Sequence, residues 1–134
     1  MRVLFCASEI YGYAKSGGLA DVGHSLAQAL IKHVEIFSVM PLYAFMDKKS
    51  YQKSSIKFSV TLGGIEYKID IYEATTESVK TYFINSSILS STKFMYGDER
   101  GEYTNNDIRF GIFCAAAVEL AAILKADIIH ANDW

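Results

Sequence analysis

The chain has 134 residues, of which 51% are hydrophobic and 21% charged, and its 13 basic and 15 acidic side chains leave a net charge of −2. The high apolar fraction and low net charge exclude a disordered chain, and the lack of a basic surplus argues against nucleic-acid binding. No stretch reaches the roughly 18 consecutive apolar residues of a membrane span, and the N-terminus lacks a signal-peptide pattern. We therefore expect a globular cytoplasmic domain that contacts neither nucleic acid nor membrane.

The first forty residues predict a strand, a helix and a second strand. Residues 2–8 form a short apolar run typical of a buried strand, and a polar, glycine-bearing loop follows it. Apolar residues then recur every three or four positions, which predicts an amphipathic helix over 19–32. A second strand is expected over 34–40, closed by Pro41 because proline cannot extend a ladder of hydrogen bonds. This order is the βαβ unit of a parallel sheet.

The middle of the chain has a different pattern. Residues 57–62 and 66–72 alternate polar and apolar side chains with a Gly-Gly pair between them, which predicts a β-hairpin. An apolar run over 79–84 predicts a further strand. Residues 85–106 are polar and long for a structureless connection, and loops of that length in compact domains are more often functional than idle.

A long helix over 107–125 and a short strand over 126–130 complete the prediction. Strands that alternate with helices in this way indicate an α/β fold, specifically a Rossmann-like, doubly wound parallel sheet with a β-hairpin insertion. Cys6 and Cys114 both lie in apolar runs, Cys114 on the apolar side of the long helix, and we expect buried free thiols rather than a disulfide. Cys6 has no basic neighbour, so a reactive thiolate is not expected there.

Ligands in such sheets bind beyond the carboxyl ends of the parallel strands, where two of the most polar loops, 9–18 and 130–134, are expected to meet. Lys15, Gly17 and Gly18 open the first predicted helix. Glycines expose the unpaired backbone N–H groups of a helix start, and a lysine adds positive charge, which suits a phosphate group. The pattern matches neither a Walker loop nor a dinucleotide fingerprint, and a plain turn with a solvated lysine remains the alternative.

Five other polar or aromatic side chains are candidates for a sugar site. Glu9 and Asp21 flank the glycine loop and suit hydrogen bonds to hydroxyls or a role as base, although Glu9 also fits a solvated strand end and Asp21 a charge that offsets the helix dipole. Asp133 suits the orientation of a hydroxyl, and Trp134 suits stacking on a sugar or base. Tyr96 is the aromatic that lies in a polar loop rather than at a periodic apolar position.

No metal centre or nucleophile is predicted. The histidines at 24, 33 and 130 do not have ligand spacing, and His33 better suits the C-terminal end of a helix, whereas His24 is expected to be a half-exposed bystander. No Ser–His–Asp order is present. The residues alone therefore predict a phosphate- or sugar-binding α/β domain and no particular reaction.

Three parts of the chain, in the same order, resemble a known family. Residues 3–9 and 15–22 read Val-Leu-Phe-Cys-Ala-Ser-Glu and Lys-Ser-Gly-Gly-Leu-Ala-Asp-Val, residues 95–98 and 103–110 read Met-Tyr-Gly-Asp and Tyr-Thr-Asn-Asn-Asp-Ile-Arg-Phe, and residues 129–134 read Ile-His-Ala-Asn-Asp-Trp. These resemble the N-terminal part of bacterial glycogen synthases and plant starch synthases, the ADP-glucose type of glycosyltransferase family 5.

The resemblance implies a retaining hexosyltransferase of the GT-B type, with an active site between two Rossmann-like domains. It implies transfer of glucose from ADP-glucose to the nonreducing end of an α-1,4-glucan such as glycogen, with no cofactor besides the donor substrate. The residues that would bind the donor phosphates are Lys15, Gly17 and Gly18. The residues that would line the acceptor and sugar side are Glu9, Asp21, Tyr96, Asp133 and Trp134.

Length sets the last expectation. Complete synthases are roughly three times as long, which suits two domains of typical size. We therefore expect residues 1–134 to be part of an N-terminal domain that carries no catalytic residue and is inactive alone. Dimerisation through the cut edge of the sheet is expected as well.

Two other classes remain as alternatives: a glucan- or nucleotide-binding module without chemistry, and a receiver- or flavodoxin-like regulatory domain. The second is disfavoured because Glu9 is the only acid at the end of the first predicted strand and no acidic pair follows it.

Overall fold

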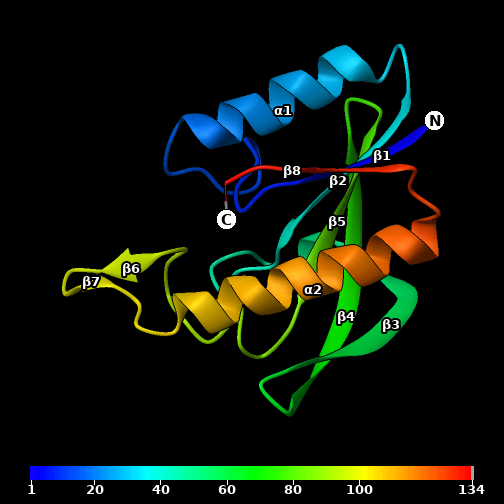
Figure 1. The fold of residues 1–134 in the computed structure, drawn as a ribbon. Coiled ribbons are helices and arrows are strands. Elements are labelled where there is room, and N and C mark those ends of the chain that lie inside the picture. The colour runs from blue at the N-terminus through cyan, green and yellow to red at the C-terminus, as the bar shows by residue number, and fades with distance from the viewer. Residues whose placement is uncertain (134) are drawn as a thin grey trace.

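A six-stranded sheet with one long helix on each side organises the computed structural model, which describes residues 1–133 (Figure 1). In chain order the elements are β1 (Arg2–Cys6), α1 (Gly18–Leu30), β2 (Glu35–Pro41), a 3₁₀ turn (Lys48–Ser50), β3 (Gln52–Leu62), β4 (Ile65–Thr76), β5 (Val79–Asn85), β6 (Gly97–Asp98), β7 (Gly101–Glu102), α2 (Asn106–Leu124) and β8 (Ile128–Ala131). The strand order is β3-β4-β5-β2-β1-β8. Strands β5, β2, β1 and β8 run parallel, whereas β3 and β4 are antiparallel additions at one side.

Both faces of the inner parallel strands β5, β2 and β1 are largely buried. On β1, Val3 and Phe5 pack in the cluster under α1, whereas Leu4 and Cys6 pack in the cluster under α2. Successive strand residues point to opposite faces, so a strand covered on both sides reads as a continuous apolar run. Figure 1 shows α1 and α2 on opposite sides of the sheet. The predicted doubly wound fold is confirmed.

The winding direction reverses beside β1. The chain passes from β1 through α1 to β2 on one side of β1, and later from β5 through α2 to β8 on its other side. The carboxyl ends of β1 and β8 therefore flank a topological switch point, where open α/β sheets bind ligands. Asn132 ties the two ends together, because its backbone N–H and its Nδ2 both donate to the Cys6 carbonyl, at 3.0 and 3.2 Å.

The predicted hairpin is confirmed and is longer than its alternating pattern indicated. Gly63 and Gly64 form a two-residue turn with φ of +59° and +79°, and Leu62 pairs with Ile65. Positive φ at both turn residues is the geometry that favours Gly-Gly. Strand β4 spans Ile65–Thr76 and so extends beyond the alternating residues 66–72. The backbone hydrogen bonds between strands continue there because they do not depend on apolar side chains.

Three local predictions need correction. Cys114 is exposed rather than buried, because α2 is apolar on nearly all sides and periodicity cannot choose its buried face. Pro41 belongs to β2 as its last residue, paired with Ile84, instead of lying outside the strand. The polar stretch 85–106 contains the small β6–β7 hairpin, where a Cβ on Gly97 would lie 2.3 Å from the Gly101 carbonyl oxygen.

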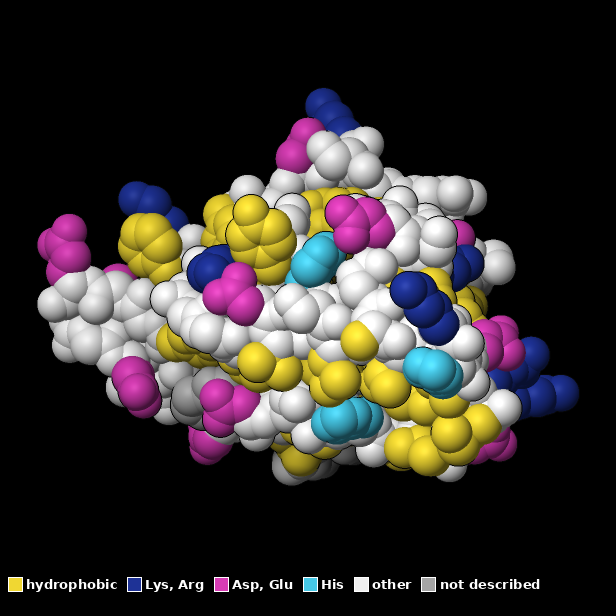
Figure 2. Space-filling view, turned by 90° about the horizontal axis from the view of Figure 1, so that it is seen from above, with side chains coloured by type: hydrophobic (Ala, Val, Ile, Leu, Met, Phe, Trp, Pro, Cys, Tyr) yellow, Lys and Arg dark blue, Asp and Glu magenta, His cyan; other side chains and the backbone are white. Residues whose placement is uncertain are grey.

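Apolar side chains remain exposed at the β8 side of the molecule. Ile128 and Ile129 on β8 are 44% and 43% exposed, and Val118 and Ile123 on α2 are 56% and 46% exposed. Figure 2 shows hydrophobic side chains in a band along the lower rim of the face that carries α1. Strand β8 pairs only with β1, so its outer backbone edge has no strand partner within residues 1–133. None of the helices described is long and apolar enough to cross a membrane.

Candidate functional site at the switch point

Glu9 lies directly beyond β1 and is only 2% exposed. Its carboxylate accepts hydrogen bonds from the Ser16 backbone N–H at 2.6 Å, the Ser16 hydroxyl at 2.7 Å and the Gly17 N–H at 3.2 Å. The interpretation of Glu9 as a solvated strand end is therefore wrong. A buried carboxylate needs such donors, and here they fold the glycine loop over the end of β1.

The Lys15 ammonium contacts both carboxylate oxygens of Asp21 at 2.6 Å and lies 5.4 Å from the centre of the Tyr11 ring. Thus a residue predicted to bind the donor phosphates, Lys15, forms an ion pair with a residue predicted to line the acceptor side, Asp21. Their side chains are 43% and 53% exposed. An exposed pair of this kind contributes roughly 0–1 kcal/mol, so Lys15 can exchange its partner for a phosphate at small cost.

The start of α1 is open. Gly17 precedes the helix and no described side chain caps it. A Cβ on Gly18 would meet no described atom within 4 Å, and one on Gly17 would meet only Glu9 Oε1, at 3.7 Å. Packing therefore does not require glycine at either position. The first-turn N–H groups of a helix attract anions, and a small residue there leaves room for a ligand to reach them.

Tyr96 joins this site from the other half of the chain. Its phenol oxygen lies 2.6 Å from Ser8 Oγ, and the Tyr43 hydroxyl donates to the Ser8 carbonyl at 2.6 Å. Burial raises the pKa of Tyr96, the hydrogen bond to Ser8 opposes this, and the nearby carboxylates of Glu9 and Asp133 raise the pKa further. The same electrostatic neighbourhood thus holds Glu9, Tyr96 and Asp133, which lie far apart in the sequence.

The segment after β8 ends at this site. Asp133 is exposed and adopts a φ of +59°. His130 in β8, three residues earlier, packs its ring against Phe5 with the centroids 5.1 Å apart. The prediction for Trp134 lies outside the described residues. The described parts of both predicted loops therefore converge, as the parallel sheet required.

An open pocket of about 630 Å³ lies between the glycine loop and the polar stretch before α2. Its lining residues are Lys15, Ser16, Phe45, Lys93, Phe94, Met95, Tyr96 and Gly97. Phe45 and Phe94 are about half exposed, at 50% and 47%. Sequence reasoning missed both, although Phe94 shares with Tyr96 the one available signal, an aromatic residue in a polar segment.

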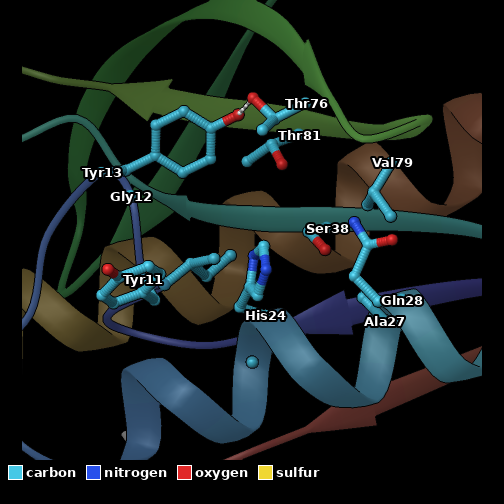
Figure 3. Close-up of a pocket in the computed structure, with 12 residues that line it drawn as sticks. Tyr11, Gly12, Tyr13, His24, Ala27, Gln28, Ser38, Thr76, Val79 and Thr81 are labelled. Carbon is cyan, nitrogen blue, oxygen red and sulfur yellow. Dashed lines mark hydrogen bonds between the residues drawn. The ribbon is translucent and has the colours of Figure 1, made fainter.

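A second hollow, of about 60 Å³, lies between α1 and the sheet (Figure 3). Ser38 and Thr81 line it from β2 and β5, and His24 lines it from α1. The His24 side chain is 28% exposed and lies 3.5 Å from the Glu77 carboxylate, which agrees with its expected half-exposed position. At the rim the Tyr13 hydroxyl and Thr76 Oγ1 are 2.8 Å apart. This hollow contains none of the predicted site residues.

Within residues 1–133, no three His, Cys, Asp or Glu side chains form a group that could hold a metal ion. Burial, with a smaller effect from the nearby Cys114, raises the pKa of the Cys6 thiol to about 12. Cys6 is therefore protonated at neutral pH, as predicted for a structural cysteine.

Residues 2–134 match the family model described as the starch synthase catalytic domain. The chain belongs to the starch synthase catalytic-domain family. It is 42% identical over its full length to a glycogen synthase of Aquifex aeolicus and 35% identical to one of Thermotoga maritima. It spans only 29% of either relative.

A solved structure of this family shares the fold. The catalytic domain of starch synthase IV from Arabidopsis thaliana, bound to ADP and acarbose, has a TM-score of 0.79 and 27% sequence identity. The likeness covers 95% of this chain and 27% of that chain. The resemblance carried by the three sequence segments is therefore confirmed at the level of family and fold.

Proposed function

We propose that the intact protein transfers glucose from ADP-glucose to the nonreducing end of an α-1,4-glucan with retention, and that residues 1–134 form one wall of its cleft. The match of residues 2–134 to the starch synthase catalytic domain carries this proposal. The site geometry supports it, because an exposed lysine and a tyrosine line one open pocket, and the helix that starts just after that lysine has no side-chain cap.

The donor phosphates would bind over the first turn of α1. In this role the Lys15 ammonium exchanges the Asp21 carboxylate for a phosphate. The ligand can come close to the backbone at Gly17 and Gly18, because neither residue has a side chain that would block it. Glu9 is buried, so it acts by holding the loop and by its position beside Tyr96. Its carboxylate would repel a phosphate, and the Lys15 charge offsets that repulsion.

The glucan would lie on the side of Tyr96. We propose that Tyr96, Asp21, Asp133 and Trp134 border the acceptor, with Tyr96 at the wall of the 630 Å³ pocket. Hydroxyl-rich sugars need both hydrogen-bonding groups and aromatic faces, and this pocket combines lysines with exposed phenylalanine rings. No cofactor beyond the donor substrate is part of the proposal.

We further propose that catalysis requires a second Rossmann-like domain of the GT-B type. Its support is the length of the relatives, of which this chain spans 29%. A wall that binds donor and acceptor without the facing domain cannot surround the reacting atoms, so the 134-residue chain by itself should be inactive.

The test begins with an antibody to this chain and extracts of its source cells. The proposal predicts a band near the size of a two-domain transferase, and the captured protein should move labelled glucose from ADP-glucose to glycogen faster than from UDP-glucose. The pure 134-residue chain, assayed in parallel, should transfer none. No transfer by the captured protein would overturn the assigned activity, and transfer by the short chain would overturn the need for a second domain.

A glucan-binding module without chemistry is the second candidate. The exposed rings of Phe45 and Phe94 beside the open pocket favour it. A native band at 14.9 kDa together with calorimetric binding of maltooligosaccharides to the short chain would select this candidate over the synthase.

A further inference from the structure

Two side chains at the start of α2 hold the backbone that carries Tyr96. Asn106 Nδ2 donates to the Tyr96 carbonyl at 2.8 Å, and Arg109 Nη1 donates to the neighbouring Met95 carbonyl at 2.9 Å. Arg109 Nη1 also donates to Asn106 Oδ1 at 2.6 Å, so the two clamping side chains are joined. They lie one helical turn apart and therefore on the same face of α2.

The buried guanidinium of Arg109 is not the side chain that would make this part of the fold most stable. Arg109 is 0% exposed, and no ion pair within residues 1–133 includes it. Its Nε and Nη2 have no hydrogen-bond partner in this part of the chain, and the rings of Tyr103 and Phe110 lie 5.3 and 5.4 Å from its guanidinium carbon. A buried cation without a carboxylate is costly compared with an apolar side chain of similar size. Its contacts therefore point to a task other than stability.

The role of Asn106 and Arg109, which we call the clamp, follows from the backbone that they contact. The backbone of Met95 and Tyr96 forms part of the wall of the 630 Å³ pocket, and the Tyr96 phenol extends from it to Ser8 at the end of β1. We propose that Asn106 and Arg109 are positioning residues that fix Tyr96 against Ser8 and so set the acceptor side of the site. For its effect on glucan, this inference rests on the proposed function.

Asn106→Asp separates positioning from stability. An aspartate retains the acceptor for Arg109 and supplies the missing negative charge, so the buried cation becomes paired. The carboxylate has no N–H, so the Tyr96 carbonyl loses the donor from helix α2 and keeps only the Tyr103 backbone N–H, at 3.0 Å. We expect the midpoint of unfolding to stay or rise while Tyr96 moves away from Ser8. A purely structural role for this pair would make both measurements change together.

Arg109→Lys is the conservative control. Within residues 1–133, Nη1 is the only Arg109 nitrogen that donates hydrogen bonds, and one lysine ammonium has enough donors for both acceptors. The substitution also removes the two unpartnered N–H groups. We expect Tyr96 to keep its position in this variant. Asn106→Ala, which removes the donor without adding charge, serves as the second disrupting variant if Asn106→Asp does not fold.

Nuclear Overhauser contacts in the 134-residue chain provide the first readout. Tyr96, assigned by its loss in Tyr96→Phe, should contact both Ser8 and Phe110, whose ring centroid lies 5.8 Å from that of Tyr96. Asn106→Asp should lower the contact with Ser8 at least about twofold, and Arg109→Lys should leave it intact. Unchanged contacts in Asn106→Asp and Asn106→Ala would overturn the clamp.

Kinetics of the intact protein provide the second readout. Asn106→Asp should raise KM for glucan about tenfold and change KM for ADP-glucose less than about twofold, with Arg109→Lys near the parent protein. If Tyr96 moves in the spectra and KM for glucan does not change, the positioning role is overturned. If the parent protein transfers no glucose, the proposed function fails, and the spectra still decide whether the clamp exists.

Discussion

At the residue scale, the contacts of Lys15 contribute little to stability and leave its charge accessible to a ligand. Its ammonium bridges the Asp21 carboxylate and the Tyr11 ring at the exposed start of α1. Because the pair is about half exposed, solvent screens it. The same exposure leaves the charge accessible to an arriving phosphate.

Lys15→Ala should therefore affect donor use far more than folding. In the intact protein we expect kcat/KM for ADP-glucose to fall roughly 10- to 150-fold. This corresponds to about 1.5–3 kcal/mol of lost binding energy for one charge-assisted contact. The free energy of unfolding should fall by less than about 1 kcal/mol in urea titrations. Lys93→Ala removes another lysine of the same pocket and is the control. Equal losses of donor use in the two variants would remove Lys15 from the proposed phosphate site.

Two glycines of the site should respond oppositely to alanine. A Cβ on Gly97 would lie 2.3 Å from the Gly101 carbonyl oxygen and 2.8 Å from Glu102 Cα, both backbone atoms. Gly97→Ala should lower the free energy of unfolding by about 1–3 kcal/mol, as overpacking does. Gly18→Ala meets open space and should be neutral or stabilise α1 by up to about 1 kcal/mol.

Chemical denaturation checks this pair, and Gly18→Ala has a functional readout as well. In the intact protein it should raise KM for ADP-glucose, because a methyl group would occupy the approach to the helix start. A large loss of stability from Gly18→Ala would show instead that packing requires the glycine.

At the scale of elements, the turns differ in how well their residues suit them. Gly63 and Gly64 match the positive φ of the β3–β4 turn, whereas the β4–β5 turn places Glu77 and Ser78 at φ of +48° and +69°. A residue with a Cβ is strained there, and glycine is not. The β4–β5 turn is thus a local weakness in the sheet.

Ser78→Gly should relieve this strain and raise the free energy of unfolding by about 0.5–1 kcal/mol. Ser55→Gly is the matched control, because Ser55 is exposed within β3 and has no positive φ. There glycine only adds freedom to the unfolded chain and should lower stability by about 0.5–1 kcal/mol. Thermal unfolding of both variants gives the signs, and two changes of equal sign would contradict the strain.

At the scale of the whole molecule, the outer side of β8 is one of the two outer edges of the sheet, and β3 forms the other. The outer backbone edge of β8 has no strand partner within residues 1–133, and Ile128 and Ile129 are both more than two-fifths exposed. Unpaired apolar edges associate with other chains. The dimerisation expected from sequence therefore remains a prediction, with a defined surface.

Sedimentation velocity of the 134-residue chain tests it. We expect concentration-dependent association, reduced by Ile129→Lys because a charge on an edge strand opposes pairing. Ile65→Lys places the same charge on another exposed isoleucine, 58% exposed at the β3–β4 turn, and should leave association unchanged. A chain that stays monomeric at high concentration would contradict the prediction.

The sequence by itself determined the order of the main helices and strands, the two-glycine turn and the family. These depend on spacings of a few residues: the period of apolar side chains in α1, the Gly63-Gly64 pair, and the run from Lys15 to Asp21. Local backbone preferences and helix or strand periodicity act over such distances, so they can be read along the chain. The meeting of the loops after β1 and β8 was also predictable, because parallel strands end at one edge.

Only the tertiary structure decided which groups become partners. Glu9 is buried because Ser16 and Gly17 fold back over it, and Cys114 is exposed because α2 turns another apolar side to the sheet. Arg109 becomes a partner of the Met95 carbonyl and of Asn106. A polar group or an apolar surface has no intrinsic partner in sequence. Its environment is set by residues that packing brings together from distant segments, and the lowest free energy of that whole arrangement selects them.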